Sequence, residues 1–283
     1  MKGHLFFFTR ICFLVVLAPL ALAEIEIITD TLKDGSKGPD LVLLPAGEFK
    51  MGCLDKKICY SDEKPRHDVS IPAGIAVMAK EVTFDQYDHY AKSMDVEFPD
   101  DYGWGRSSRP VIHVSWDDAN DYAMWLSEQT GKKYVLMSES VWEYAARAGT
   151  ATNYFSGADP SSLCKVANVA DISLAKQKQS KPQVNCDDGY GKQTAPVGSF
   201  IANDFGLYDM HGNVREWVAD CYEDDYRQSP KDHSARLECS EEDYVIRGGA
   251  WYSFAWMLTS SSRQYDAPYK SSYSIGFRLM RLP

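Results

Sequence analysis

The sequence predicts a fold of mixed helices and strands with little regular secondary structure, and three observations lead to this prediction. Helices with recognisable caps can be argued only between residues 83 and 149. A pair of short strands about a Pro/Gly turn is indicated at residues 41–52. From residue 150 to residue 283 the helical period is almost absent, and short apolar groups alternate with Gly, Asn, Asp and Ser. We therefore expect the second half of the chain to be dominated by loops.

Three segments begin with a side chain that can cap a helix. In the first two, the capping Thr or Ser is followed three residues later by Gln or Asp, as in a capping box. The capping residues are Thr83, Ser115 and Ser138. Glycines close the second and third segments, at Gly131 and Gly149. These signals predict three helices.

The composition is that of an ordinary globular protein. The 283 residues are 45% hydrophobic and 25% charged, with 13 Pro and 19 Gly, which excludes a collagen-like, coiled-coil or disordered chain. The net charge is −10, without a basic run, so binding to nucleic acid is not expected. The 17 Tyr, 12 Phe and 7 Trp can fill a core that has few long helices.

Residues 1–23 have the three parts of a secretory signal peptide. Lys2 and Arg10 precede an apolar run over residues 11–22. The run ends at the small-x-small cleavage site Ala21-Leu22-Ala23. The run is shorter than the roughly 20 residues of a membrane-spanning helix, so cleavage is favoured over anchoring. Cleavage removes two basic residues and changes the net charge from −10 to −12. We expect a periplasmic or secreted bacterial protein with no membrane span after cleavage.

The rest of the chain divides into two parts. Residues 24–40 are polar and contain Gly and Pro, and we expect them to form an N-terminal lead-in segment. The folded domain is expected to span residues 41–283.

The cysteines indicate disulfides. Cys12 falls in the signal peptide, and the six that remain are Cys53, Cys59, Cys164, Cys186, Cys221 and Cys239. An even number in an exported chain is typical of disulfide bonding. Six cysteines allow 15 connectivities, so the sequence alone leaves the pairing open, although their order suggests the local loops 53–59, 164–186 and 221–239. A zinc site is the weaker alternative, because no C-x-x-C and no His at ligand spacing is present.

Several motifs, in order, resemble those of one family. Residues 139–149 resemble its "EAEWEYAARGG" helix, and residues 194–200 are similar to its "T-x-PVGSF" strand. Residues 205–217 resemble "FGLYDMxGNVWEW", and residues 247–251 and 275–278 resemble the closing "RGGSW" and "GFR". The family is that of the formylglycine-generating enzyme, or sulfatase-modifying factor, and the resemblance runs from about Leu41 to Pro283. It implies a single α+β domain related to C-type lectins.

The resemblance also implies two structural Ca²⁺ sites. The ligands of the first would be Asp209, Gly212, Val214 and Glu216, and those of the second Asn168, Val169, Asp188 and Tyr190. Gly212, Val214, Val169 and Tyr190 would offer backbone carbonyls, because Ca²⁺ takes six to eight oxygens from carboxylates and carbonyls together. The alternative is a pair of hydrogen-bonded acidic turns without metal.

Copper is not expected. Family members that make formylglycine carry two cysteines shortly after the Gly-Gly-Ser motif, and these thiolates bind Cu(I). Here the first position falls on Ser253 and the second on or near Leu258, and no cysteine follows Cys239. Formylglycine-generating activity is therefore not expected, although a different oxidase activity stays open.

Two classes of function follow from the resemblance. The first is a binding or regulatory accessory protein with a protein or peptide partner in the periplasm, for example a regulator of type VI secretion that acts on a membrane kinase. The alternative is an oxidative maturation enzyme of a secreted peptide or protein, similar to the pyoverdine-maturation or formylglycine-generating members. In that case the residues expected to line the substrate groove are Trp251, Tyr252, Ser253, Trp256 and Arg263.

Overall fold

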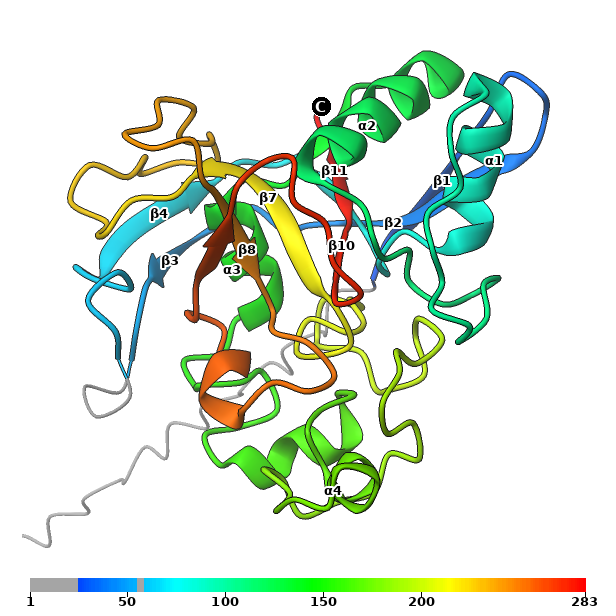
Figure 1. Ribbon diagram of the computed structural model, residues 1–283. Helices are drawn as coiled ribbons and strands as arrows, with labels where there is room; N and C mark the ends of the chain where they lie inside the picture. Colours follow the sequence, from blue (N-terminus) through cyan, green and yellow to red (C-terminus); the bar gives the residue numbers. More distant parts are fainter. Residues whose placement is uncertain (1–24, 55–58) are drawn as a thin grey trace, which may run out of the picture.

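Figure 1 shows a computed structural model of the chain, which describes residues 25–54 and 59–283. The predicted signal peptide at residues 1–23 lies outside the described residues. Within the described ranges no helix is long and apolar enough to cross a lipid bilayer.

The main sheet has five strands and is antiparallel throughout. Its order is β1-β2-β5-β11-β6, so the strand nearest the C-terminus lies between two strands from the first half of the chain. The strands are β1 (Ile27–Thr31), β2 (Lys37–Leu43), β5 (Ala76–Met78), β11 (Leu279–Arg281) and β6 (Tyr134–Leu136).

Two smaller sheets complete the strand content. The four-stranded sheet has the order β10-β7-β8-β9, with β10 and β7 parallel and the other neighbours antiparallel. Its strands are β10 (Ile275–Phe277), β7 (Arg215–Cys221), β8 (Tyr244–Arg247) and β9 (Gln264–Asp266). Strands β3 (Gly47–Met51) and β4 (His67–Ile71) pair with each other in an antiparallel hairpin. With the helices, these sheets confirm a single α+β domain.

The segment expected as a lead-in is part of the main sheet. Residues 27–31 form β1, and residues 37–43 form β2, its antiparallel partner. Leu32 and Leu41 are buried beside them in the core. Strand β1 lies at the edge of the sheet with alternating exposed and half-buried side chains, and this weak apolar signal explains why a polar segment was expected.

The three predicted helices are present. They are α1 (Phe84–Met94), α2 (Trp116–Thr130) and α3 (Glu139–Arg147). Thr83, Ser115 and Ser138 each accept a hydrogen bond from a backbone N–H of the first turn. The C-cap residue of helix α2 is Gly131, as expected. The C-cap residue of α3 is Ala148, one residue before the expected Gly149. The residues of the "T-x-PVGSF" motif form turns rather than a strand.

The second half contains helices that the sequence did not indicate. Asp171 caps the seven-residue helix α4 (Ile172–Lys178), and two short 3₁₀ helices cover Pro160–Lys165 and Ala255–Leu258. They are too short to produce a readable helical period. Between them the chain is largely loops, as expected (Figure 1).

The structure contains three disulfides, and they are the local pairs that the order of the cysteines suggests. They join Cys53 to Cys59, Cys164 to Cys186 and Cys221 to Cys239. Disulfides of this number are typical of an oxidising, exported compartment.

Candidate functional site

The site region begins where strand β8 ends. Gly249 has a φ of +72°, and a Cβ there would lie 2.6 Å from Cδ2 of Leu258, so the turn requires glycine. The loop then runs through residues 250–262 and returns beside its own start. Arg247 fastens it, because its guanidinium donates to the carbonyls of Ser260, Ser261 and Ser262 at 2.6–2.9 Å.

Neither position that carries a copper-binding cysteine in the family offers a ligand here. Ser253 is 2% exposed, and its Oγ accepts a hydrogen bond from the backbone N–H of Ala250 at 2.9 Å. Leu258 is fully buried in an apolar cluster with Tyr154 and Leu163. The six cysteines among the described residues are paired in disulfides outside this loop. The loop therefore has a packing role at both positions.

Aromatic side chains from distant parts of the chain gather around this loop. Trp251 contacts Trp104 edge-on at 5.6 Å between ring centroids and Tyr252 at 4.8 Å. Tyr273 contacts both Trp104 and Trp251, and Tyr102 contacts Tyr273 at 5.5 Å. Trp251 is almost completely buried and supports the others.

A second group of rings continues from the first. Phe254 stacks on Trp256, which contacts Tyr60 at 5.2 Å, and Phe254 lines the same cavity as Tyr252. We call the combined surface the aromatic strip; its members are Tyr60, Tyr102, Trp104, Trp251, Tyr252, Phe254, Trp256 and Tyr273. Five of them, Tyr60, Tyr102, Phe254, Trp256 and Tyr273, are 36–51% exposed. Exposed rings in such a group are characteristic of binding surfaces.

The predicted groove residues divide between surface and interior. Trp256 and Tyr252 belong to the accessible part of the aromatic strip, whereas Trp251 and Ser253 are buried beneath it. Arg263 does not line a groove. Its guanidinium forms a buried pair with Glu139 at 2.7 Å, donates to two backbone carbonyls and lies over the rings of two tyrosines.

The first predicted calcium set lies in a buried cluster of acids. Gly212 has a φ of +83°, and a Cβ there would lie 2.1 Å from the carbonyl oxygen of Asn168, so the two predicted sets are in direct contact. Asp209 is buried; its Oδ2 accepts from the N–H of Gly198, and its Oδ1 has no partner among the described residues. Both oxygens of Glu216 accept from Arg278 at 2.8–3.0 Å.

A third carboxyl group, which the sequence did not indicate, completes this cluster. Glu81 is 1% exposed and accepts from Nδ2 of Asn213. Burial, and then the charge of Asp209, raise the pKa of Glu81 well above its ordinary value. Burial also raises the pKa of Asp209 to about 6. Three buried carboxyl groups face one guanidinium, an excess of acid that a divalent cation would neutralise.

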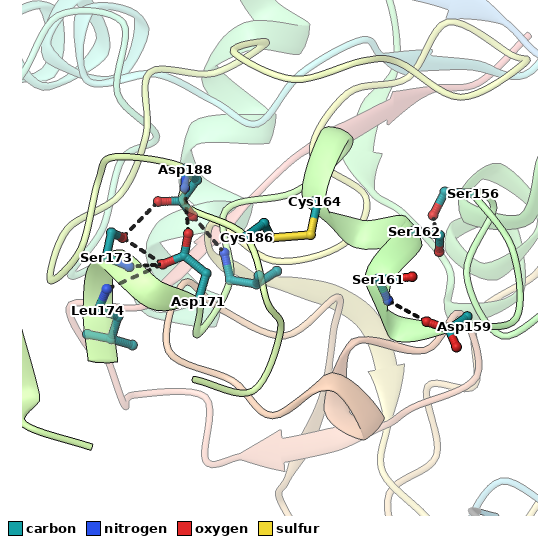
Figure 2. Close-up of a disulfide and its surroundings, with 11 residues drawn as sticks. Ser156, Asp159, Ser161, Ser162, Cys164, Asp171, Ser173, Leu174, Cys186 and Asp188 are labelled. Carbon is teal, nitrogen blue, oxygen red and sulfur yellow. Dashed lines mark hydrogen bonds between the residues drawn. A yellow bond between two sulfur atoms is a disulfide. The ribbon is translucent and has the colours of Figure 1, made fainter. Parts of the chain in front are cut away.

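The second predicted set is more fully hydrogen-bonded. Figure 2 shows Asp188 beside Asp171 and Ser173, close to the Cys164–Cys186 disulfide. Asp188 accepts from the N–H groups of Val169 and Tyr190 and from Oγ of Ser173. Burial is the main cause that raises its pKa. Oδ1 of Asn168 is buried without a partner among the described residues.

The donor chemistry of both sets suits Ca²⁺, although side-chain ligands do not converge by themselves. Among the described residues, the single group of three His, Cys, Asp or Glu ligand atoms within 4.8 Å is that of Cys53, Cys59 and Glu63. The two cysteines of that group are bonded to each other. Backbone carbonyls would therefore supply much of the coordination in either calcium site, and calcium stays a prediction.

Comparison with known proteins defines the class. The model of the family described as the sulfatase-modifying factor enzyme 1-like domain matches residues 29–283. The chain belongs to this family.

The relatives include solved structures of similar extent. The structure of PvdO from Pseudomonas aeruginosa has a TM-score of 0.78 and 35% identity, and the match covers 91% of this chain and 98% of that one. Treponema denticola variable protein 1 has the same fold, with a TM-score of 0.70 at 21% identity, covering 91% of this chain and 99% of that one.

The curated relatives are longer proteins. The formylglycine-generating enzyme of Mus musculus is 32% identical over 185 residues, which are 64% of this chain and 46% of that enzyme. The serine/threonine-protein kinase Pkn1 of Chlamydia trachomatis is 27% identical over 283 residues, 92% of this chain and 41% of the kinase. The chain thus spans about half the length of the curated relatives it matches.

Proposed function

We propose that this protein is an exported accessory protein that binds a protein or peptide segment along the aromatic strip, without copper chemistry. The observation that carries the proposal is the accessible row of rings beside a loop without cysteine, in which the first cysteine position falls on Ser253 and the second on or near Leu258. Rigid aromatic side chains provide large contact area at a small entropic cost, and they dominate the energetics of many interfaces. A periplasmic location accords with the disulfides.

A regulatory role is the form of this function that we favour. The similarity to a protein named as a serine/threonine kinase supports it. In this form the partner would be the outer part of a membrane kinase, as in regulation of type VI secretion. The chain's own contribution would be the aromatic strip, which holds the partner segment.

Peptide display against the purified mature protein tests the binding function. We expect enrichment of sequences with apolar or aromatic anchors, and loss of that enrichment in the double variant Phe254→Ser/Trp256→Ser. Leu237→Ser is the matched control, because Leu237 is an exposed apolar residue, 72% exposed, that does not belong to the strip. Equal enrichment by the wild type and the double variant would overturn the proposal.

Oxidative maturation of a secreted peptide or protein is the second candidate. It is favoured by the cavity beside Tyr252, shortly after the glycine turn that precedes the copper-binding cysteines of the enzymes. In this role, a peptide bound at the aromatic strip would lose two hydrogen atoms, and dioxygen would accept them and leave as hydrogen peroxide. Mass spectrometry of peptides selected by display, incubated with protein in air, would detect a loss of about 2 Da. An unchanged mass would exclude the oxidation of these peptides.

Calcium is proposed as a structural ion for the two acidic sets. The support is the unpartnered Oδ1 of Asp209, the unpartnered Oδ1 of Asn168 and the excess of buried acid around Glu81. An ion at these positions would hold together loops that otherwise depend on the Cys164–Cys186 disulfide.

A further inference from the structure

A cavity of about 200 Å³ opens beside the aromatic strip, between helix α4 and the site loop. Its wall is apolar where Leu174, Tyr252 and Phe254 meet, and its rim carries Lys178 and Lys181. An apolar wall with cations at the rim suits a small group that has an apolar stem and a negative end.

The charges at this rim differ from those of the molecule as a whole. The chain carries ten more acidic than basic residues, yet the two charged side chains that reach solvent at the cavity are both lysines. The acid in the lining, Asp171, is fully buried and accepts backbone N–H groups of Ser173 and Leu174. Its charge is therefore directed into the protein.

Lys178 contacts aromatic rings of the strip and not a carboxylate. Its Nζ lies 5.5 Å from the ring centroids of both Trp251 and Tyr252, and no carboxylate of the described residues lies within salt-bridge distance of it. Lys176, on the same helix, instead pairs with Asp187 at 2.9 Å. Cation–π contact keeps the Lys178 ammonium beside the cavity while leaving its hydrogen-bond donors available.

We propose that this cavity binds a carboxylate of the segment that lies on the aromatic strip, so that the preferred partner is an acidic peptide. The inference rests on the proposed function and specifies its partner. The carboxylate would lie between Lys178 and Lys181, with its stem against Leu174 and Phe254. An acidic side chain and a C-terminal carboxylate present the same chemistry, and the experiment separates them.

The test uses fluorescence anisotropy with labelled peptides and the mature protein. The probes contain Glu-Trp-Glu or Gln-Trp-Gln in a Gly/Ser frame, each with an amidated or a free C-terminus. Two exposed ion pairs contribute modestly, so we expect the Glu peptide to bind roughly tenfold more tightly than the Gln peptide when both are amidated. Preference only for the free C-terminus would assign the cavity to a terminal carboxylate.

Variants locate the preference on the rim. Lys178→Gln/Lys181→Gln should bring the affinities for acidic and neutral peptides within about twofold, and higher salt should do the same to the wild type. Lys176→Gln is the matched control and should leave the preference unchanged. A preference that survives in the double lysine variant, or no preference between any of the probes, would overturn the carboxylate site.

The outcomes separate this inference from the function on which it rests. If the neutral peptide binds and Phe254→Ser/Trp256→Ser abolishes that binding, the aromatic strip is a binding surface whatever the lysines do. If both peptides bind equally to the wild type and to the strip variant, the proposed function fails, and the carboxylate site fails with it.

Discussion

Glu143 shows how much of this fold depends on single buried charges. Its side chain is fully buried, and its two oxygens accept from Arg147 at 2.7 Å and from Arg247 at 2.6 Å. It also accepts from the backbone N–H of Gly52 at 2.8 Å. One carboxylate therefore connects helix α3, strand β8 and Gly52, the residue that follows strand β3. The same carboxylate orients the guanidinium of Arg247, which binds the carbonyls of the site loop.

Glu143→Gln should lower the free energy of unfolding by about 3–5 kcal/mol, because it removes the charged partner of the buried Arg147 and the nearer of the two charged partners of Arg247, whose other partner, Glu139, lies at 3.6 Å. Urea unfolding followed by tryptophan fluorescence measures this. Glu48→Gln, at an exposed position of strand β3, is the control and should change stability by less than about 0.5 kcal/mol. Equal midpoints for the two variants would contradict this account of the cluster.

The same residue predicts an acid-sensitive stability. Burial raises the pKa of Glu143, but the charges of Arg147 and Arg247 lower it by more than burial raises it. The pKa of Glu143 therefore lies below 4.5. Because the pKa is lower in the folded than in the unfolded state, the stabilisation is present above the unfolded pKa and is lost as pH falls through the folded pKa. Urea midpoints should therefore drop below about pH 4.5, and drop less steeply in Glu143→Gln. Parallel profiles would show that other groups cause the loss.

The residues that sequence analysis misplaced are those whose partners are distant in the chain. The family resemblance places Arg263 in the substrate groove, but Glu139 holds it in the interior. Glu81 and Lys178 carry no local signal at all, since their importance arises from Asp209 and Trp251, which are far away in sequence. A family resemblance indicates which residue stands at a given position of the sequence. It does not indicate which side chains contact that residue, because tertiary packing determines those contacts.

Among elements, the three longest helices and the short strands at residues 41–52 were predictable, whereas strand pairing was not, because β2 and β3 pair with other strands and not with each other. Each of the three predicted helices begins at a side chain that caps its own first turn, which is a local interaction that a sequence displays. Strands β5, β6, β10 and β11 have three residues each. They are paired across long distances in the sequence, and such short runs show no readable alternation.

The loops of the second half should depend on their covalent link. The Cys164–Cys186 disulfide joins the 3₁₀ helix Pro160–Lys165 to the turn that holds Asp188 (Figure 2). Cys164→Ser/Cys186→Ser should lower the free energy of unfolding by about 2–4 kcal/mol, because the unfolded chain gains freedom. Chemical denaturation measures the loss, and thiol titration of the denatured wild type should find no free thiol. Two or more thiols in the wild type would contradict the pairing.

The acidic loop should depend on calcium. A chelator removes the cation that would offset the buried acids, so the melting temperature should fall by several degrees, and added Ca²⁺ should restore it. Asp209→Asn should weaken the response, because the second set keeps its own ion, while leaving the Glu216–Arg278 pair intact. Asp187→Asn, at a surface salt bridge, should respond to chelator as the wild type does. An unchanged melting temperature, together with no calcium found by elemental analysis, would contradict the calcium sites. The two sets would then be hydrogen-bonded acidic turns without metal.

At the scale of the whole molecule, we expect the family fold without copper chemistry. Purified protein given copper, oxygen, a reductant and a cysteine-containing sulfatase peptide should produce no formylglycine. Cu(I) requires thiolate ligands, and the positions that would supply them hold Ser253 and Leu258. Peptide mass spectrometry against a no-protein control makes the measurement. A formylglycine product above the control would require a ligand set outside these positions.

The position of strand β11 also bears on how the molecule is made. Its residues 279–281 pair with β5 on one side and β6 on the other, so the central sheet cannot close until residues 279–281 have left the ribosome. Until then, two strand edges stay open to pairing with other chains. Because the sheet closes late, we expect its open edges to be prone to aggregation during synthesis, and late closure is compatible with export of the chain before it folds.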